Sequence, residues 1–208
     1  MIKNVPYVER FLLYCIEMLR HSIRPTQKIA MKRILLFAFL LLAGTMTAQK
    51  IEWMSMGDAL AAQEKEPKKI IMDVYTTWCG PCKLLDRNTF ADPQVAAFIN
   101  ENYYPVKFNA EGTEEITYQD FTYTNPNYQP GRKGRNAQHL FAHALKVTGY
   151  PSLVFFKEDG SLIQAVAGYK TPQQLEIFLK MIANDDYKTL TTASAWQEYQ
   201  DNFKGTFK

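Results

Sequence analysis

Short apolar segments alternate with longer amphipathic ones between residues 50 and 183. The apolar runs predict strands at 69–75, 104–109, 152–157 and 162–167, with a short first strand at 51–55. The segments between them predict helices at 57–66, 79–88, 92–102, 136–146 and 171–183. Because strands and helices alternate along the chain, we expect an α/β fold in which a central mixed sheet carries helices on both faces.

Two segments lie outside this alternation. Residues 110–135 are rich in Thr, Asn, Gly and Tyr, and their pattern predicts a small hairpin near 116–123. Residues 194–197 fit a capping box and predict a short helix within a C-terminal extension, 184–208. We therefore expect a core domain over 49–183 that contains an insert at 110–135.

The beginning of the chain has the pattern of an export signal. A basic segment at 31–33 precedes an apolar run at 34–42, and small residues follow up to Ala48. This order predicts a signal peptide over 31–48, cleaved near Ala48, and a periplasmic or secreted protein. The apolar run is well short of the ~20 residues that span a bilayer, so we expect no stable membrane span after cleavage. Residues 1–30 are interpreted as an upstream extension from a mis-assigned start; the alternative is an uncleaved anchor.

The formal charge of +3 is distributed unevenly along the chain. Residues 1–48 hold seven of the 24 basic residues and two of the 21 acidic ones. Residues 49–208 therefore hold 17 basic and 19 acidic residues, which gives them a net charge of −2. This charge does not favour nucleic acid as a partner. The local basic run at 132–135 is too short to change this and is interpreted as a solvated loop.

Two of the three cysteines form a C-x-x-C pair. Cys15 lies before the predicted domain, which leaves Cys79 and Cys82. A loop this short constrains little chain, so the pair calls for a chemical explanation. Cys79 stands at the start of a predicted helix, where the helix dipole and free N–H groups stabilise a thiolate. We expect Cys79 to attack a disulfide and Cys82, one turn further on, to resolve the mixed disulfide.

A zinc site is the structural alternative for this pair. His139 and His143 form an H-x-x-x-H pair that would complete Cys2His2 ligation. The cysteines, however, lie between a strand and a helix, and the histidines lie far along the chain on the polar side of a predicted helix, where we expect them to be solvated. Redox chemistry is therefore favoured, and no metal is expected.

The run from Trp78 to Lys83 is identical to the active-site run of the thioredoxin superfamily, and residues 50–183 as a whole resemble that family. Residues 88–95 are also similar to thioredoxin-like periplasmic domains. Four further residues match family positions. Asp73 lies on the strand before the cysteines and Lys107 on the next strand. Pro151 matches the family's cis-proline, and Gly168 matches a glycine beside the groove at that proline. The resemblance implies a thioredoxin fold, with the insert before the cis-proline segment.

The resemblance also implies roles for these residues. Asp73 would be a buried carboxylate with a raised pKa that accepts the proton of Cys82, and Lys107 would be its partner or a solvated strand lysine. Trp78 would cover the disulfide. A cis bond before Pro151 would leave a neighbouring backbone group open to a substrate strand. The implied substrate-binding residues are Trp78, Gly80, Pro81, Tyr150, Pro151 and Gly168.

Gly80 and Pro81 between the cysteines resemble the reducing members of the family. We therefore predict an exported thiol–disulfide oxidoreductase, without a cofactor, that reduces protein disulfides and receives electrons from an upstream thiol donor such as a membrane reductase. A disulfide isomerase is the first alternative. The second is a non-catalytic thioredoxin-fold binding or zinc module whose partner contacts lie on the 110–135 insert. That insert is expected either to bind partners or to cover a sheet edge.

Overall fold

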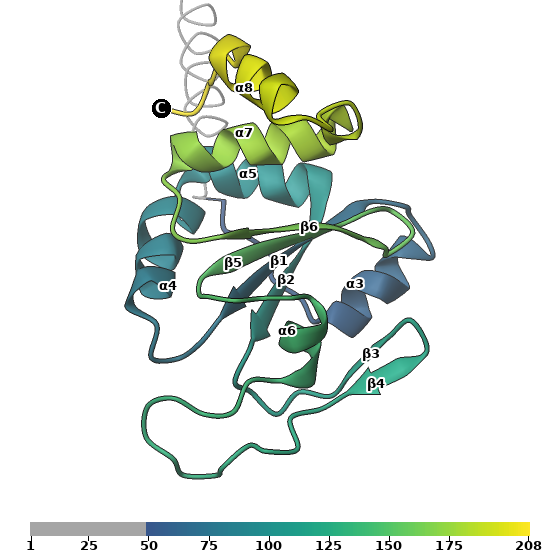
Figure 1. The fold of residues 1–208 in the computed structure, drawn as a ribbon, viewed down its shortest axis with the longest axis vertical. Helices are drawn as coiled ribbons and strands as arrows, with labels where there is room; N and C mark the ends of the chain where they lie inside the picture. The colour runs from purple at the N-terminus through teal and green to yellow at the C-terminus, as the bar shows by residue number, and fades with distance from the viewer. Residues whose placement is uncertain (1–48) are drawn as a thin grey trace, which may run out of the picture. The chain divides into compact units, whose positions relative to one another are not determined.

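A mixed four-stranded sheet lies at the centre of residues 49–208, the part of the chain that the computed structural model describes (Figure 1). Its strands, in the order β2-β1-β5-β6, are β1 (Lys69–Tyr75), β2 (Tyr103–Asn109), β5 (Ser152–Phe156) and β6 (Leu162–Ala167). Strand β2 is parallel to β1, whereas β5 is antiparallel to both β1 and β6. The strand expected at 51–55 is instead a single parallel bridge between Met54 and Val106.

The predicted upstream extension, the signal peptide and its cleavage near Ala48 lie outside the described residues. Within residues 49–208, no helix combines the length and the apolar character needed to cross a membrane.

Helices cover both faces of the sheet, which confirms the expected α/β architecture (Figure 1). One face packs against α3 (Met56–Gln63), α6 (Leu140–Ala144) and the hairpin of β3 (Ile116–Tyr118) and β4 (Phe121–Tyr123). The other face packs against α4 (Gly80–Leu85), the π-helical turn η1 (Asp86–Phe90), α5 (Pro93–Asn102) and α7 (Pro172–Ala183).

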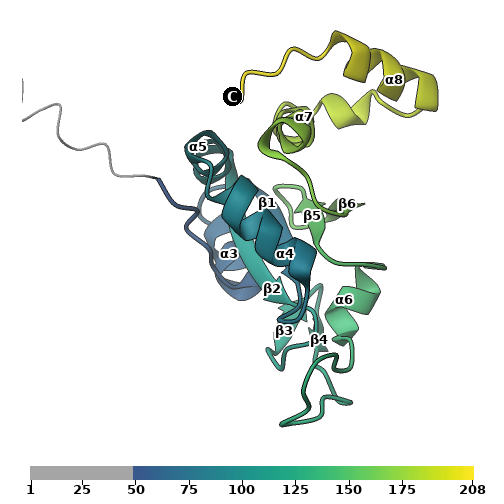
Figure 2. The same cartoon turned by 90° about the vertical axis from the view of Figure 1, so that its left-hand side faces the viewer.

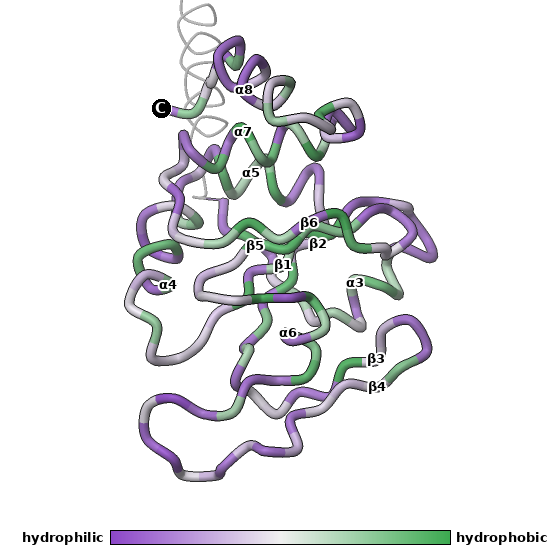
Figure 3. Tube along the Cα trace, viewed as in Figure 1, coloured by the Kyte–Doolittle hydropathy of each residue, from purple (hydrophilic) through white to green (hydrophobic). Residues whose placement is uncertain are grey.

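Strand β1 supplies both layers of the core because successive side chains of a strand point to opposite faces. Ile70 and Met72 join the layer under α3 and α6, whereas Ile71 joins the layer under α4, α5 and α7. Asp73 has the same parity as Ile71 and therefore lies on the face that carries α4. Figure 3 shows the apolar character of the central strands and the polar character of the loop between β4 and α6.

Two helices differ from the sequence-based expectation. The helix expected at 79–88 is α-helical only over α4 and continues as η1. The helix expected at 136–146 is confined to α6. Tertiary hydrogen bonds explain the second difference, because the N–H of Asn136 donates to Glu111 and the N–H of Ala137 donates to the Asn136 side chain. Those residues are thereby held in a loop.

The C-terminal extension contains η2 (Asp186–Lys188) and α8 (Ala193–Asn202). Helix α8 lies beyond α7, on the side of α7 away from the sheet (Figure 2). The expected short helix is therefore present, but its N-cap is Thr192 and not Ser194, because the Thr192 side chain accepts the hydrogen bond from the first helical turn.

Aromatic and polar contacts fasten this extension to α7. The rings of Phe178 and Trp196 lie 5.6 Å apart. Glu176, which is buried on α7, accepts hydrogen bonds from the N–H groups of Thr206 at 2.6 Å and Phe207 at 3.0 Å. The last residues of the chain are therefore held against the core by a buried carboxylate.

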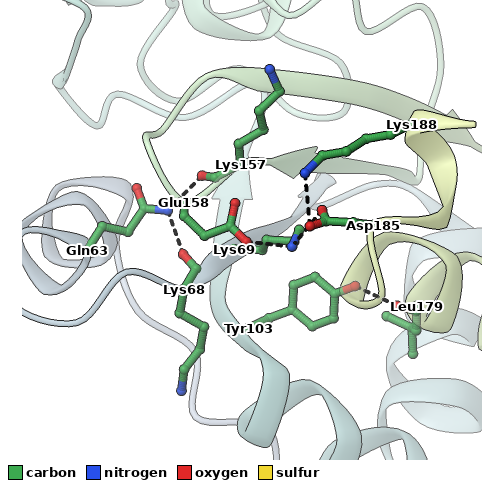
Figure 4. A network of polar contacts seen from close by, with 9 residues as sticks. All are labelled: Gln63, Lys68, Lys69, Tyr103, Lys157, Glu158, Leu179, Asp185 and Lys188. Atoms are coloured by element: carbon green, nitrogen blue, oxygen red, sulfur yellow. Dashed lines mark hydrogen bonds and ion pairs between the residues drawn. The ribbon is translucent and has the colours of Figure 1, made fainter.

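A buried lysine joins further segments at the end of β1 that is remote from the cysteines (Figure 4). The Lys69 ammonium lies 2.5 Å from Glu158 in the β5–β6 turn and 3.0 Å from Asp185 in the C-terminal extension. Nearby, the Gln63 side chain of α3 donates to the backbone carbonyl of Lys157 at 2.8 Å. This network connects α3, the sheet and the extension.

Candidate redox-active site

Cys79 and Cys82 form a disulfide at the beginning of α4, immediately after β1. Cys79 is the N-cap of the helix and has an extended backbone, and the N–H of Cys82 donates to its sulfur at 3.1 Å. Pro81 occupies the first turn, where its missing N–H costs no helical hydrogen bond. The two Cα atoms are 5.3 Å apart. Helix N-termini favour the thiolate form of cysteine, so the geometry suits Cys79 as a nucleophile.

The disulfide itself is largely covered. Cys79 and Cys82 are each only 2% exposed, whereas Gly80 and Pro81 between them are exposed. Cys82 faces the sheet together with Leu85 of the same helix. A reaction partner must therefore approach along the surface formed by the residues that surround the pair.

Asp73 is buried beneath α4 and is 1% exposed. Its Oδ2 atom lies 2.6 Å from the ammonium of Lys107, its register partner on β2. Its Oδ1 atom has no hydrogen-bonding partner among the described residues. Burial raises the pKa of Asp73 to about 6, because the attraction of Lys107 offsets only part of the desolvation cost.

Lys107 connects this carboxyl to a second one. Its ammonium also contacts Asp86 of η1 and lies over the rings of Trp53 and Phe90 at 4.9 and 5.3 Å. Lys107 was expected to be either the partner of Asp73 or a solvated lysine on the strand. The structure shows it in contact with Asp73. Asp86 was not identified from the sequence. Its position four residues after Cys82, one helical turn along the same face, is the signal that could have found it.

Both ends of the insert meet beside Trp78. The indole N–H donates to Oε2 of Glu111 at 2.8 Å, and the N–H of Asn136 donates to the same oxygen at 2.8 Å. The Arg135 guanidinium lies 4.5 Å from the centre of the indole ring, on which it forms a cation–π contact. We call Glu111 and Asn136, joined in this way to Trp78, the clasp. Glu111 was not recognised from the sequence, because it belongs to no local motif. Arg135 was noticed only as part of the basic run at 132–135, which was interpreted as a solvated loop.

The segment before β5 lies on the other side of Trp78. The Trp78 and Tyr150 rings meet edge to face at 6.2 Å, and the Tyr150–Pro151 peptide bond is cis. The N–H of Gly168, which has a φ of 88°, donates to the Pro151 carbonyl at 2.7 Å. The structure thus brings together four of the residues that the resemblance implied. Trp78 packs on Tyr150, Tyr150 precedes Pro151, and Pro151 is hydrogen-bonded to Gly168.

His139 differs from the expectation of a solvated histidine. It is fully buried, its Nδ1 accepts the N–H of Phe141, and its Nε2 lies 2.7 Å from the Glu114 carbonyl. Burial lowers its pKa, and His143 is exposed as expected. In the described part of the chain, no three His, Cys, Asp or Glu side chains come together in a group that could hold a metal ion.

The insert has two parts with different surroundings. The β3–β4 hairpin packs on the core, where Tyr118 meets the ring of Phe156 at 5.9 Å. In the described residues β3 pairs only with β4, and the hairpin packs on the face of the sheet that carries α3 and α6. The second part, 124–135, ends beside Trp78, where the Arg135 guanidinium lies over the indole ring.

Residues 56–183 match the family described as the Thioredoxin-like domain. The chain is 26% identical over 128 residues to the thiol:disulfide interchange protein DsbD of Pectobacterium atrosepticum, a match that covers 61% of this chain but only 18% of that protein. It is 29% identical over 114 residues to thioredoxin of Echinococcus granulosus, covering 54% of this chain and 77% of that one.

Among solved structures, the DsbH oxidoreductase is similar with a TM-score of 0.42 and 19% identity, covering 74% of this chain and 89% of that chain. The chain spans less than a fifth of the length of the DsbD protein it matches. The family match covers most of the described domain and includes the cysteine pair, Asp73, Lys107 and Pro151. The chain therefore belongs to the thioredoxin-like domain family, and carries a C-x-x-C pair at disulfide distance in a thioredoxin fold.

Proposed function

We propose that this protein is an exported thiol–disulfide oxidoreductase that reduces disulfides in other proteins. One observation carries the proposal: Cys79 and Cys82 are paired at a helix N-terminus, on the same side of the sheet as the buried carboxyl of Asp73. A structural disulfide would need no titratable group buried beneath it. Buried carboxyls with a raised pKa are typical of proton-transfer sites.

The first step is attack by the Cys79 thiolate on one sulfur of a substrate disulfide. A bond forms between Cys79 and that sulfur, the substrate's own S–S bond breaks, and the other substrate sulfur leaves as a thiolate that takes a proton from water. The backbone N–H of Cys82 and the helix N-terminus stabilise the attacking thiolate.

The second step is attack by Cys82 on the sulfur of Cys79. The Cys82 thiol loses its proton, the Cys79–Cys82 bond forms, and the substrate leaves as a second thiolate. Two electrons thus pass from the enzyme dithiol to the substrate disulfide. With a pKa of about 6, Asp73 is mostly ionised near neutral pH and can accept the Cys82 proton on Oδ1, while Lys107 holds Oδ2.

Reduction is the direction that we propose, with isomerisation as the alternative. The Gly80–Pro81 pair resembles the reducing members of the family, and the similarity to a thiol:disulfide interchange protein supports exchange with protein partners. An exported reductase needs an upstream thiol donor, for which a membrane reductase is our candidate. The protein substrates and this donor are the proposed partners.

The reduction potential of the cysteine pair tests this direction. The protein is equilibrated with glutathione redox buffers and its free thiols are counted after alkylation. A potential near about −250 mV or lower supports a reductase. A potential above about −180 mV would instead favour an isomerase or an oxidase. A value near about −120 mV, that of strong oxidants, excludes the reductase.

A trapping experiment separates catalysis from binding alone. The reduced Cys82→Ser variant should accumulate a mixed disulfide between Cys79 and a disulfide-containing substrate protein, because the resolving thiol is gone, whereas Cys79→Ser should form none. If the Cys82→Ser variant traps nothing and the wild type shows no turnover, the non-catalytic binding module replaces the enzyme.

A further inference from the structure

A groove of about 760 Å³ lies beside the redox pair. Trp78, which precedes Cys79, and Tyr150, which precedes Pro151, belong to its lining. The rest of the wall comes from the insert and from the segment around α6, through Arg135, Gln138, His143 and Lys146. A group bound in this groove therefore lies against Trp78 and Tyr150, which directly precede Cys79 and Pro151 in the chain.

The charged groups of this groove are mainly cationic. Arg135 and Lys146 are exposed, and within residues 49–208 neither takes part in an ion pair. Among the described residues, Glu111 is the single acidic one in the lining, and its Oε2 already accepts hydrogen bonds from Trp78 and Asn136.

This local charge stands out against the rest of the domain. Residues 49–208 carry a net charge of −2, so the cations beside the redox pair are not part of a generally basic surface. Complementary charges at a contact surface speed encounter and discriminate among partners, whereas like charges disfavour wrong ones. A volume of this size accommodates a few side chains of an extended segment but not a folded domain.

We propose that this groove selects protein disulfides whose reactive cysteine is flanked by acidic side chains. The carboxylates would lie between Arg135 and Lys146, while the substrate cysteine reaches Cys79 past Trp78. This proposal rests on the thiol–disulfide exchange proposed above and specifies its substrate class.

Peptide reduction measures the selectivity directly. The substrates are three disulfide-linked peptide homodimers of one sequence, in which Glu, Gln or Lys flanks the single cysteine. Flanking charge alters the intrinsic reactivity of a disulfide, so each kcat/KM is divided by the rate constant for reduction of the same peptide by dithiothreitol. We expect the normalised kcat/KM to be about tenfold higher for the Glu peptide than for the Lys peptide, since two exposed charge contacts are involved.

Charge reversal identifies the residues responsible. In the double variant Arg135→Glu with Lys146→Glu, the preference should invert in favour of the Lys peptide. Lys133→Glu is the matched control, because Lys133 is exposed in the same loop but does not line the groove, and it should keep the wild-type ratio. The wild-type ratio should also decrease between about 0.02 and about 0.5 M salt, because salt screens exposed charges.

Equal normalised values for the three peptides, or a preference that the double variant retains, would overturn the proposal. Reduction of the uncharged 2-hydroxyethyl disulfide by the wild type serves as the reference reaction. If that reaction proceeds without peptide selectivity, only the groove proposal fails. If the wild type reduces neither the uncharged disulfide nor any peptide, the proposed reductase fails and the substrate class fails with it.

Discussion

Replacement of Asp73 by Asn should make the oxidised protein more stable at neutral pH. Asp73 is 1% exposed, and burial raises its pKa from the ordinary 3.8 to about 6 even with Lys107 beside it. The folded state therefore resists ionisation of this carboxyl more than the unfolded state does. The amide removes that cost, and Lys107 keeps its contact with Asp86.

The size and the sign of the effect follow from linkage. The difference between 3.8 and about 6, at 1.36 kcal/mol per pKa unit, corresponds to about 3 kcal/mol. Between these two pH values the folded state binds more protons than the unfolded state, so wild-type stability falls as the pH rises. The advantage of Asp73→Asn should thus be about 0.5 kcal/mol at about pH 4 and reach about 3 kcal/mol above about pH 6.5.

Urea unfolding of the oxidised protein, followed by circular dichroism between about pH 4 and pH 7.5, measures this difference. Asp120→Asn is the control, because Asp120 lies exposed in the β3–β4 turn with a φ of 62° that Asn tolerates well. Its stability should follow the wild type at every pH. A wild type that is more stable than Asp73→Asn at pH 7.5, or a difference that does not change with pH, would refute the reasoning.

Two further predictions concern other carboxyls. Asp86→Asn should lower the pKa of Asp73, because the nearby charge of Asp86 helps to raise it. The acid limb of the plot of turnover rate against pH should therefore move to lower pH. A limb that does not move would contradict this coupling. Glu176→Gln should destabilise the fold by about 1–3 kcal/mol and expose residues 203–208 to proteolysis, because the hydrogen bonds that hold Thr206 and Phe207 are weakened. The exposed Glu198→Gln should change neither unfolding nor cleavage, and equal cleavage of both variants would exclude the role of Glu176.

Elements with local signals were predicted closely from the sequence. Strand β1 spans Lys69–Tyr75 as expected, because a continuous apolar run is needed where a strand is buried on both faces. Helix α5 begins at the Asp92–Pro93 cap, and Thr171 caps α7. The cysteine pair follows from its spacing and the strand before it. These features depend on neighbours in the chain, which a sequence pattern records.

Features that depend on distant residues could not be predicted in this way. The expected helix at 136–146 is shortened because Asn136 is bound to Glu111, a contact across 25 positions. His139 was expected in solvent but is buried, since the Glu114 carbonyl on the insert meets its ring. Glu111 and Arg135 also became part of the site only through the closure of the insert.

The clasp has a consequence for how such proteins diversify. Glu111 and Asn136 close the base of the insert beside Trp78, and Asn125 bridges its two sides from within. Side-chain hydrogen bonds of 126–134 stay within that loop and its junction at Asn136. The loop is therefore insulated from the catalytic framework, much as hypervariable loops are carried on an antibody scaffold. Evolution or an engineer can therefore replace the sequence at 126–134 while the contacts that hold Trp78 beside the redox pair are conserved.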